Sequence, residues 1–408
     1  MILPVAEALS SMAHKAQSHL PQSIRLRSGN QMMAEGALQA GCMFFAGYPI
    51  TPATGIFKTM IDLLPAKGGI ALSAPDEISA IAYCIGASMR GSRSMTATSG
   101  PGWALMIESV QYALMTETPL VVSLVQRLGP STGGATQGAQ GDVLLAEFCT
   151  SGGYTIPVLC PTNASECYEL TILAFTWAEL LRMPVILLSD KETGMTIESV
   201  DFSSLPRSTA QNRPSNFAFR DLGTHNRTER KGTYYFDALH EIPPFAPVGG
   251  DRKVTATGSA HDKQGRLQKN STETIDVLKH LEQKISWRRD DFISVVSDLQ
   301  PSATTLVVSY GVTARAARSA VQQARNAGER ISLLVIHSLF PIPVKKLTHA
   351  LQGVDTVLVA EENMSGLYRS VLERYCRGVK VRGVNKIGAM ITPEEILEAV
   401  FEEPWQPA

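Results

Sequence analysis

The sequence predicts an α/β protein: a doubly wound, mostly parallel sheet followed by a smaller α/β domain. Apolar runs of strand length alternate with helical patterns over residues 24–190, and again from residue 301 onward. This alternation is typical of β–α–β units and a parallel sheet. Residues 119–125 form a nearly continuous apolar run, as expected for a strand that is buried on both faces.

Composition limits the possible classes of function. The chain has 408 residues, with 44% hydrophobic and 18% charged residues, as in a globular protein of two or three domains. Its 37 Lys and Arg nearly balance its 38 Asp and Glu, so no nucleic-acid partner is indicated. The six cysteines form no CxxC pair, and therefore no local zinc or iron–sulfur motif. Neither a signal peptide nor an apolar stretch of about 20 residues is present, so we expect a cytoplasmic protein without a membrane span.

The first domain is expected over residues 22–232, after an N-terminal lead of residues 1–21. A helix is predicted over 31–41, a strand over 42–46 and a helix over 53–64. Prolines on both sides prevent an earlier helix start, so Thr51 is predicted to be the N-cap and Pro52 the first helical residue. Thr51 either caps the helix or, as a hydroxyl at a helix start, helps to receive an anion such as a carboxylate.

Glu77 stands at the head of a predicted helix in which small, uncharged residues dominate. An acid in a first helical turn is favoured by the helix dipole, and this stretch alone favours that structural role. Further along, a strand over 93–98 runs into Ser99, Gly100 and Gly102 before the next helix. Such strand–turn–helix corners lie at the carboxyl ends of strands, where open α/β sheets bind ligands.

Arg127 follows the apolar strand and opens a polar, Gly-rich loop. Because the carboxyl ends of parallel strands share one edge of a sheet, we expect Arg127 near Thr51 and Glu77. A guanidinium at this edge is a candidate anion clamp. The alternation continues through a strand over 154–159, a helix over 165–181 and a strand over 184–189.

The pattern weakens after residue 190, and residues 233–300 are expected to link two domains, with helical spacing returning over 272–299. The second domain is expected over 301–408. Its predicted elements are strands over 304–309, 331–336 and 354–360, and helices over 313–327, 344–351 and 366–377. Residues 361–363 are interpreted as a turn at the end of a strand.

Four blocks occur in order along the first domain, over residues 47–52, 77–88, 98–102 and 126–133. Together they resemble the alpha subunit of 2-oxoacid:ferredoxin oxidoreductases, with most similarity to the 2-oxoglutarate (KorA-like) branch. The resemblance extends to residues 309–311 and 361–366 and covers most of residues 24–395. The second domain resembles the C-terminal domain of transketolase.

The resemblance implies a thiamine diphosphate enzyme whose alpha subunit supplies the pyrimidine-binding domain. The beta subunit of such enzymes supplies the diphosphate and Mg²⁺ domain and a [4Fe–4S] cluster, so no metal-binding residue is expected in this chain. Glu77 then matches the catalytic glutamate that hydrogen-bonds to the cofactor's pyrimidine ring, while Thr51 and Arg127 match residues that hold the substrate carboxylate. The implied cofactor-binding residues are Ile50, Glu77, Ser99, Gly100 and Gly102.

The implied reaction is CoA-dependent oxidative decarboxylation of a 2-oxoacid, with 2-oxoglutarate favoured. Its products are an acyl-CoA, CO₂ and reduced ferredoxin. Activity is expected only with the beta subunit, in a dimer of heterodimers, and a gamma subunit stays open.

Some tracts depart from the family. Gly141 and Asp142, with the later Asn163, resemble the diphosphate motif only weakly, and we interpret them as coincidental. Residues 144–153 and 258–262 differ from the 2-oxoglutarate branch, so an aryl- or branched-chain 2-oxoacid such as phenylglyoxylate is an alternative substrate. Two further alternatives are a thiamine reaction of the transketolase or dehydrogenase type, and a non-catalytic scaffold paralogue.

Overall fold

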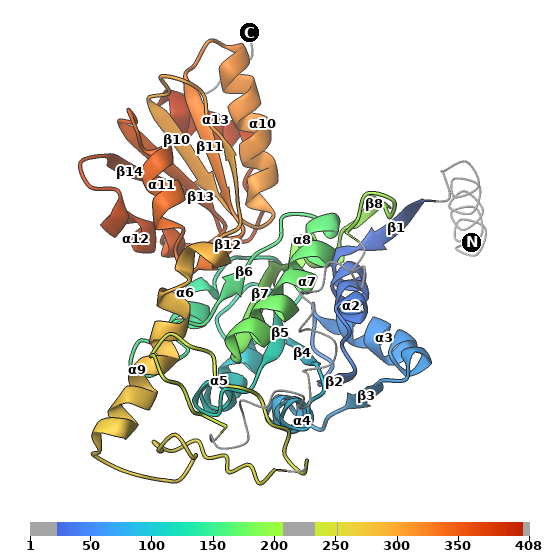
Figure 1. Ribbon diagram of the computed structural model, residues 1–408. Coiled ribbons are helices and arrows are strands. Elements are labelled where there is room, and N and C mark those ends of the chain that lie inside the picture. Colours follow the sequence, from blue (N-terminus) through green and yellow to red (C-terminus); the bar gives the residue numbers. More distant parts are fainter. Residues whose placement is uncertain (1–22, 207–232, 251, 403–408) are drawn as a thin grey trace, which may run out of the picture.

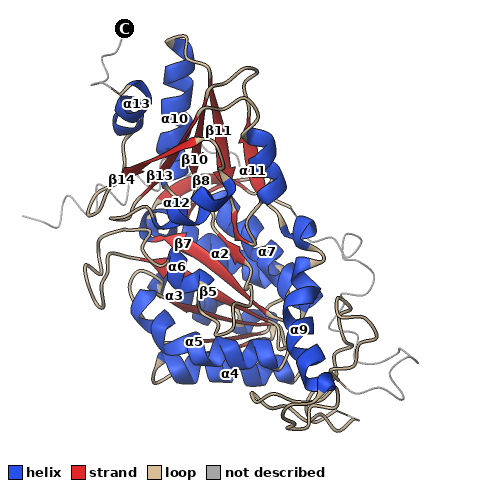
Figure 2. Ribbon diagram, turned by 90° about the vertical axis from the view of Figure 1, so that its left-hand side faces the viewer, coloured by secondary structure: helices blue, strands red, loops and turns tan. Residues whose placement is uncertain are grey.

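The computed structural model describes residues 23–206, 233–250 and 252–402 (Figure 1). The expected N-terminal lead, residues 1–21, lies outside this range. Figure 2 shows two lobes, each with helices packed around strands. In the described part of the chain, no helix is long and apolar enough to cross a membrane.

The first lobe is built on a seven-stranded sheet with the order β12-β6-β7-β5-β4-β2-β3. Its strands are parallel except for β12, which runs antiparallel to β6. Every residue of β5 and β7 is buried, as the apolar runs predict. The strands are β2 (Phe44–Gly47), β3 (Ile70–Ser73), β4 (Ser94–Thr98), β5 (Leu120–Gln126), β6 (Val158–Leu159), β7 (Pro184–Asp190) and β12 (Ser338–Phe340).

Helices cover both faces of this sheet: α2 and α7 pack together on one face, α4 and α5 on the other (Figures 1 and 2). Most of the longer helices begin at a side-chain cap. Ser28 caps α2, Asp76 caps α4 and Asn163 caps α7. The helices are α2 (Gly29–Gln39), α3 (Thr54–Leu63), α4 (Glu77–Met89), α5 (Gly100–Met115), α6 (Val143–Glu147), α7 (Ala164–Leu181), α8 (Lys191–Met195) and α9 (Thr272–Ser286). A separate antiparallel pair joins β1 (Ile24–Ser28) to β8 (Ile197–Asp201).

The second lobe contains a five-stranded sheet with the order β14-β13-β10-β11-β9, in which only β9 is antiparallel to its neighbour. Helices α10 and α13 pack against each other beside this sheet. The elements are β9 (Val295–Asp298), β10 (Thr305–Ser309), α10 (Thr313–Asn326), β11 (Ile331–Ile336), α11 (Val344–Ala350), β13 (Thr356–Glu361), α12 (Leu367–Leu372), β14 (Lys380–Asn385) and α13 (Pro393–Phe401).

The described part of residues 233–300 is packed, which corrects the expected linker. The Arg182 guanidinium donates to the main-chain carbonyls of Thr233, Pro243 and Pro244. The expected helix over 272–299 ends at Ser286, and residues 295–298 form β9 in the second sheet. Arg182 of the first lobe thus supplies hydrogen-bond donors to three main-chain carbonyls in the part of this segment that lacks regular secondary structure.

Candidate active site

The carboxyl ends of β2, β4 and β5 lie at one edge of the parallel sheet, and the loops that follow them hold the predicted site residues. Thr51 follows β2, Ser99 follows β4 and Arg127 follows β5. Glu77 begins α4, shortly after the neighbouring strand β3. The fold therefore brings together loops that lie as far as 76 residues apart in the chain.

Glu77 is the first residue of α4 and is only 7% exposed. The preceding residue, Asp76, caps the helix by accepting a hydrogen bond from Ser79 N at 2.7 Å. Among the described residues, none forms a hydrogen bond or ion pair with the Glu77 carboxylate. The sequence thus places a buried carboxyl group at the sheet edge, with its hydrogen-bonding capacity free for a ligand.

Gly102 is required by the close approach of Glu77. A Cβ atom at Gly102 would lie 2.6 Å from both Cγ and Oε1 of Glu77 and would also collide with the hydroxyl of Thr98. The φ angle of Gly102 is not positive, so the requirement is one of space. The sequence interpretation of Gly102 as part of a turn is incomplete, since this glycine lies within α5.

Asp142 lies on the other side of the first turn of α5. A Cβ atom at Gly100 would lie 2.9 Å from Asp142 Oδ1. Burial raises the pKa of Asp142 to about 6, while the positive charge of Arg127 acts in the opposite direction. Within the described residues, Asp142 Oδ2 and Ser99 Oγ are both buried without a hydrogen-bond partner. The start of α5 therefore lies between two carboxyl groups, those of Glu77 and Asp142.

Arg127 and Thr51 are in direct contact. The Arg127 guanidinium donates to the main-chain carbonyl of Thr51 at 2.5 Å. Arg127 is 7% exposed, and its Nε has no partner in the described part of the chain. The loop after β2 thus holds the guanidinium through its Nη1 group, and the Nε donor remains unused.

The prediction that Thr51 caps the next helix is wrong. Residues 51–53 form a turn, and α3 begins at Thr54 with Ala53 at the N-cap, where no side chain caps the helix. The Thr51 carbonyl accepts a hydrogen bond from Arg127. The conformation of this turn therefore depends on a residue that is distant in the sequence. Ile50 is partly buried against the core of the first lobe.

Asp142 is the residue that the sequence interpretation missed. Its sequence signal is its position directly after the Gly-rich loop, within a tract that resembles a diphosphate motif only weakly. Asn163, the other half of that likeness, caps α7 by accepting a hydrogen bond from Glu166 N.

Residues 361–363 do more than end a strand. Glu361 is fully buried and accepts hydrogen bonds from Tyr310 Oη at 3.0 Å and Asn363 Nδ2 at 2.6 Å. The next residue, Glu362, bonds through its main chain to the loop of the first lobe. This turn therefore belongs to the junction between the lobes.

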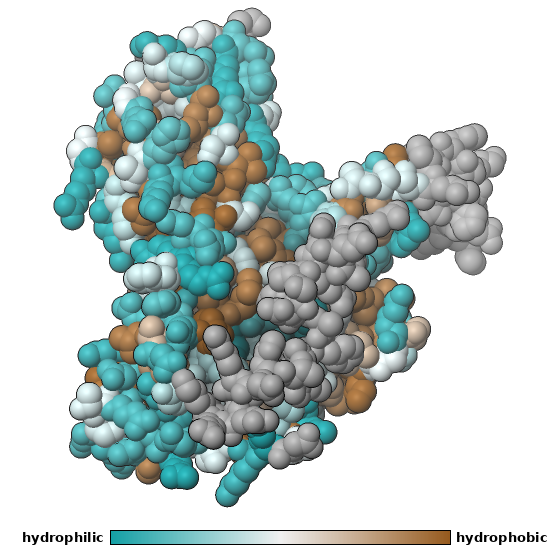
Figure 3. Space-filling view, in the orientation of Figure 1, coloured by the Kyte–Doolittle hydropathy of each residue, from teal (hydrophilic) through white to brown (hydrophobic). Residues whose placement is uncertain are grey.

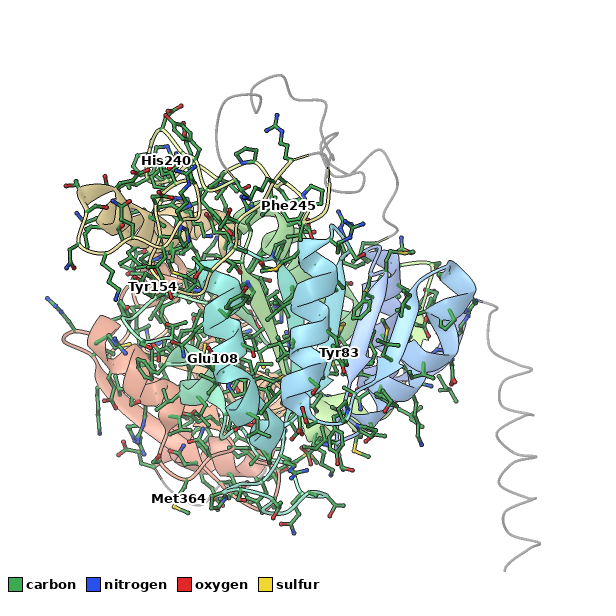
Figure 4. The ribbon with its side chains drawn as sticks, turned by 90° about the horizontal axis from the view of Figure 1, so that it is seen from below. Tyr83, Glu108, Tyr154, His240, Phe245 and Met364 are labelled. Carbon is green, nitrogen blue, oxygen red and sulfur yellow. The ribbon has the colours of Figure 1, made fainter. Side chains whose placement is uncertain are left out.

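Exposed apolar side chains lie on the elements around the candidate site. They include Ile78 at the start of α4, Leu105 on α5, Phe148 after α6 and Met364 after β13. Figure 4 shows α4 and α5 side by side, with Met364 at the margin. On the face drawn in Figure 3, apolar atoms also gather at the waist between the lobes. Among the described residues, no three His, Cys, Asp or Glu side chains form a group that could hold a metal ion.

Comparisons with known proteins match both lobes. The thiamine diphosphate-binding domain of pyruvate flavodoxin/ferredoxin oxidoreductase matches residues 35–278, and core domain II of pyruvate:ferredoxin oxidoreductase matches residues 303–396. The 2-oxoglutarate synthase subunit KorA of Methanothermobacter thermautotrophicus is 37% identical over 378 residues, which is 92% of this chain and 97% of the relative. The ketoisovalerate oxidoreductase subunit VorB of the same organism is 30% identical over 379 residues, which is 92% of this chain and 96% of the relative.

A solved structure has the same fold. It is a 2-oxoglutarate:ferredoxin oxidoreductase from Magnetococcus marinus with 2-oxoglutarate, coenzyme A and succinyl-CoA bound. Its TM-score is 0.85 at 30% sequence identity, and the match covers 94% of this chain and 66% of that chain. The likeness therefore spans nearly all of the present chain and about two thirds of the solved one.

Proposed function

The chain belongs to the pyruvate flavodoxin/ferredoxin oxidoreductase family, and we propose that it is the alpha subunit of a 2-oxoglutarate:ferredoxin oxidoreductase. The reaction is the oxidative decarboxylation of the 2-oxoacid with CoA, which gives an acyl-CoA, CO₂ and reduced ferredoxin. The names of the KorA relatives and of the solved neighbour support 2-oxoglutarate as the substrate. The ketoisovalerate relatives share less identity, 30% against 37%, so a branched-chain substrate is the second candidate.

The free carboxyl group of Glu77 is the observation that carries this proposal. Thiamine diphosphate, when bound, supplies the electron sink that decarboxylation of a 2-oxoacid requires. Glu77 would hold the pyrimidine ring by a hydrogen bond from its buried carboxyl group. Ser99, Gly100 and Gly102 would lie beside the ring, because they follow β4 at the same sheet edge as Glu77 and Gly102 is in close contact with that residue. The unpartnered Ser99 Oγ fits the same use.

Arg127 and Thr51 would hold the carboxylate of the substrate. The guanidinium is oriented by the Thr51 carbonyl and keeps an unused donor at Nε. A guanidinium that is already fixed loses little entropy when it binds a carboxylate. Ile50, which precedes Thr51, contributes apolar surface next to the cofactor.

The other half of the site lies on a partner. We propose a beta subunit that supplies the diphosphate and Mg²⁺ domain and a [4Fe–4S] cluster, in a dimer of heterodimers that passes electrons to ferredoxin. The subunit names of the relatives support a multi-subunit complex. Exposed apolar side chains around the site, such as Phe148 and Met364, suit a docking surface. The six cysteines are buried and unpaired, which fits the cytoplasm.

The test is turnover of the reconstituted complex with Glu77→Gln. This variant keeps the shape of the side chain but removes its titratable proton, and we expect turnover to fall about 10²–10⁴-fold, the range for loss of an acid–base group. The matched control is Glu329→Gln, an exposed glutamate after α10 in the second lobe, which should leave turnover unchanged. If Glu77→Gln left turnover unchanged, the proposed role of Glu77 in binding the cofactor would be wrong.

Two further measurements separate the alternatives. A substrate panel of 2-oxoglutarate, 2-oxoisovalerate and phenylglyoxylate should give the highest kcat/KM for 2-oxoglutarate. An optical spectrum of the co-purified complex should show iron–sulfur absorption. Its absence would instead favour a transketolase- or dehydrogenase-type reaction.

A further inference from the structure

Gln140 joins the two lobes and uses all of its hydrogen-bonding groups. It is fully buried at the end of the loop that begins at Arg127. Its side chain makes four hydrogen bonds and its main chain two, at 2.7–3.2 Å. One partner is in the first lobe and the others are in the second: Asp190 Oδ2, Tyr310 O, Thr313 Oγ1, Glu362 N and O, and Asn363 Nδ2.

The neighbours of Arg127 are tied to residues on both sides of Gln140. Gln126 Oε1 accepts a hydrogen bond from Asp142 N at 2.9 Å. Leu128 N donates to Gln137 O, also at 2.9 Å. If Gln140 moved, the adjacent chain at Gln137 and Asp142 would move with it. Their hydrogen bonds to Leu128 and Gln126 would then shift Arg127, which lies between those two residues.

The two lobes are closely packed around Gln140. Gly311, in the second lobe, has a φ of +56°, and a Cβ atom there would lie 2.5 Å from Gln140 Nε2 and would collide with Asp190 Oδ2. Val312 N, the next main-chain donor, bonds to the same carboxylate oxygen at 2.7 Å. The main chain of the second lobe is thus in direct contact with the amide of Gln140.

We propose that Gln140 is a positioning residue for the 2-oxoacid site, through which the second lobe fixes the loop that holds Arg127 and Asp142. Gln140 itself does not touch the substrate. The identity of the substrate rests on the proposed function, but the coupling of the second lobe to the loop does not. The second lobe thereby acts on substrate binding without placing a side chain in the site.

The test compares Gln140→Met with Tyr310→Phe in the reconstituted complex. Gln140→Met keeps the length of the side chain and removes its four hydrogen bonds. Tyr310→Phe removes one buried hydrogen bond, to Glu361, within the second lobe, and leaves the bonds of Gln140 in place. We expect Gln140→Met to raise KM for 2-oxoglutarate at least tenfold, with KM for CoA unchanged. Tyr310→Phe should lower the melting temperature and leave both KM values unchanged.

A purely structural role for Gln140 predicts a different result. Gln140→Met would then lower the melting temperature but keep KM for 2-oxoglutarate at the wild-type value, and this outcome overturns the proposal. If Gln140→Met fails to fold, Thr313→Val replaces it, because it removes one hydrogen bond to Gln140 without changing the shape of the side chain. A rise in KM of about threefold supports the proposal, and a change of less than 1.5-fold overturns it.

Hydrogen exchange separates this inference from the proposed function. The proposed function fails if the wild-type complex turns over none of the 2-oxoacids. The inference is then decided in the full-length chain, by amide exchange of residues 128–141. Faster exchange in Gln140→Met, or in Thr313→Val, than in Tyr310→Phe supports positioning of the loop by the second lobe. Equal exchange rates overturn it.

Discussion

Replacing Gly102 with alanine tests whether the position of Glu77 controls activity. The added methyl group would lie 2.6 Å from Cγ and Oε1 of Glu77, whereas carbon contacts are most favourable at about 3.5–4.0 Å. The Thr98 hydroxyl would lie closer still. Both this hydroxyl and the Glu77 carboxyl group must therefore move, the carboxyl group by about 1 Å, or α5 must shift by as much. A misplacement of about 1 Å at a reacting group can reduce turnover about 10²-fold. We expect a loss of this size in the reconstituted complex.

The cost to folding should be much smaller than the cost to turnover. Overpacking a core costs about 1–3 kcal/mol, but alanine is favoured over glycine in a helix by about 0.5–1 kcal/mol. The free energy of unfolding should therefore fall by only about 0–2.5 kcal/mol. The control is Gly86→Ala in the neighbouring helix α4, where an added Cβ meets nothing within 4 Å and a small gain in stability is expected.

The assay combines ferredoxin reduction with chemical denaturation of the isolated chain. Turnover of Gly102→Ala within about threefold of wild type would contradict control of activity by the position of Glu77, because a displacement of about 1 Å is expected to cost far more. A loss of turnover that is fully explained by unfolding would refute it as well.

Three further predictions test other parts of the structure. Arg127→Lys should raise KM for 2-oxoglutarate about 10–150-fold, the value of a hydrogen bond to a charged group, and an unchanged KM would contradict the clamp. Burial, together with the negative charge of Asp190, raises the pKa of Glu362 to about 7 from its ordinary 4.5. The folded chain therefore holds a proton that the unfolded chain loses, so stability should fall as pH rises from about 4.5 to 7, and urea titrations of Glu362→Gln should show a weaker fall. Lys284→Met leaves the buried carboxylate of Glu117 without its closest cation and should cost about 3–5 kcal/mol in thermal unfolding, part of which Glu117→Gln should restore.

The sheet and its edge could be predicted because their signals are local. The apolar run at 119–125 is the strand Leu120–Gln126, and the acidic residue before the Ala-rich stretch begins α4 at Glu77. An apolar run and a helix start are each encoded within about ten neighbouring residues. The parallel arrangement then places Glu77, Ser99 and Arg127 at one edge without further information.

The errors arise where distant contacts decide the local structure. Thr51 looks like a cap, but its carbonyl binds Arg127, which lies 76 residues away. Asp142 looks like a chance match, but it packs against Gly100, whose sequence neighbours give no sign of it. The expected linker packs against the first lobe, where Arg182 donates to carbonyls that lie 51–62 residues away in the chain. Such contacts have no period that a sequence window could detect.

The antiparallel pairing of β12 with β6 has a consequence for synthesis. One edge strand of the first sheet is residues 338–340, although its neighbour, β6, is residues 158–159. About 180 residues separate the two strands. At about 5–20 residues per second, a ribosome takes about 10–35 s to synthesise these intervening residues. During that interval the nascent sheet has an open edge at β6, which only the second lobe can close. A shortened transcript that stops before residue 338 would therefore release a first lobe with an exposed strand, open to pairing with other chains.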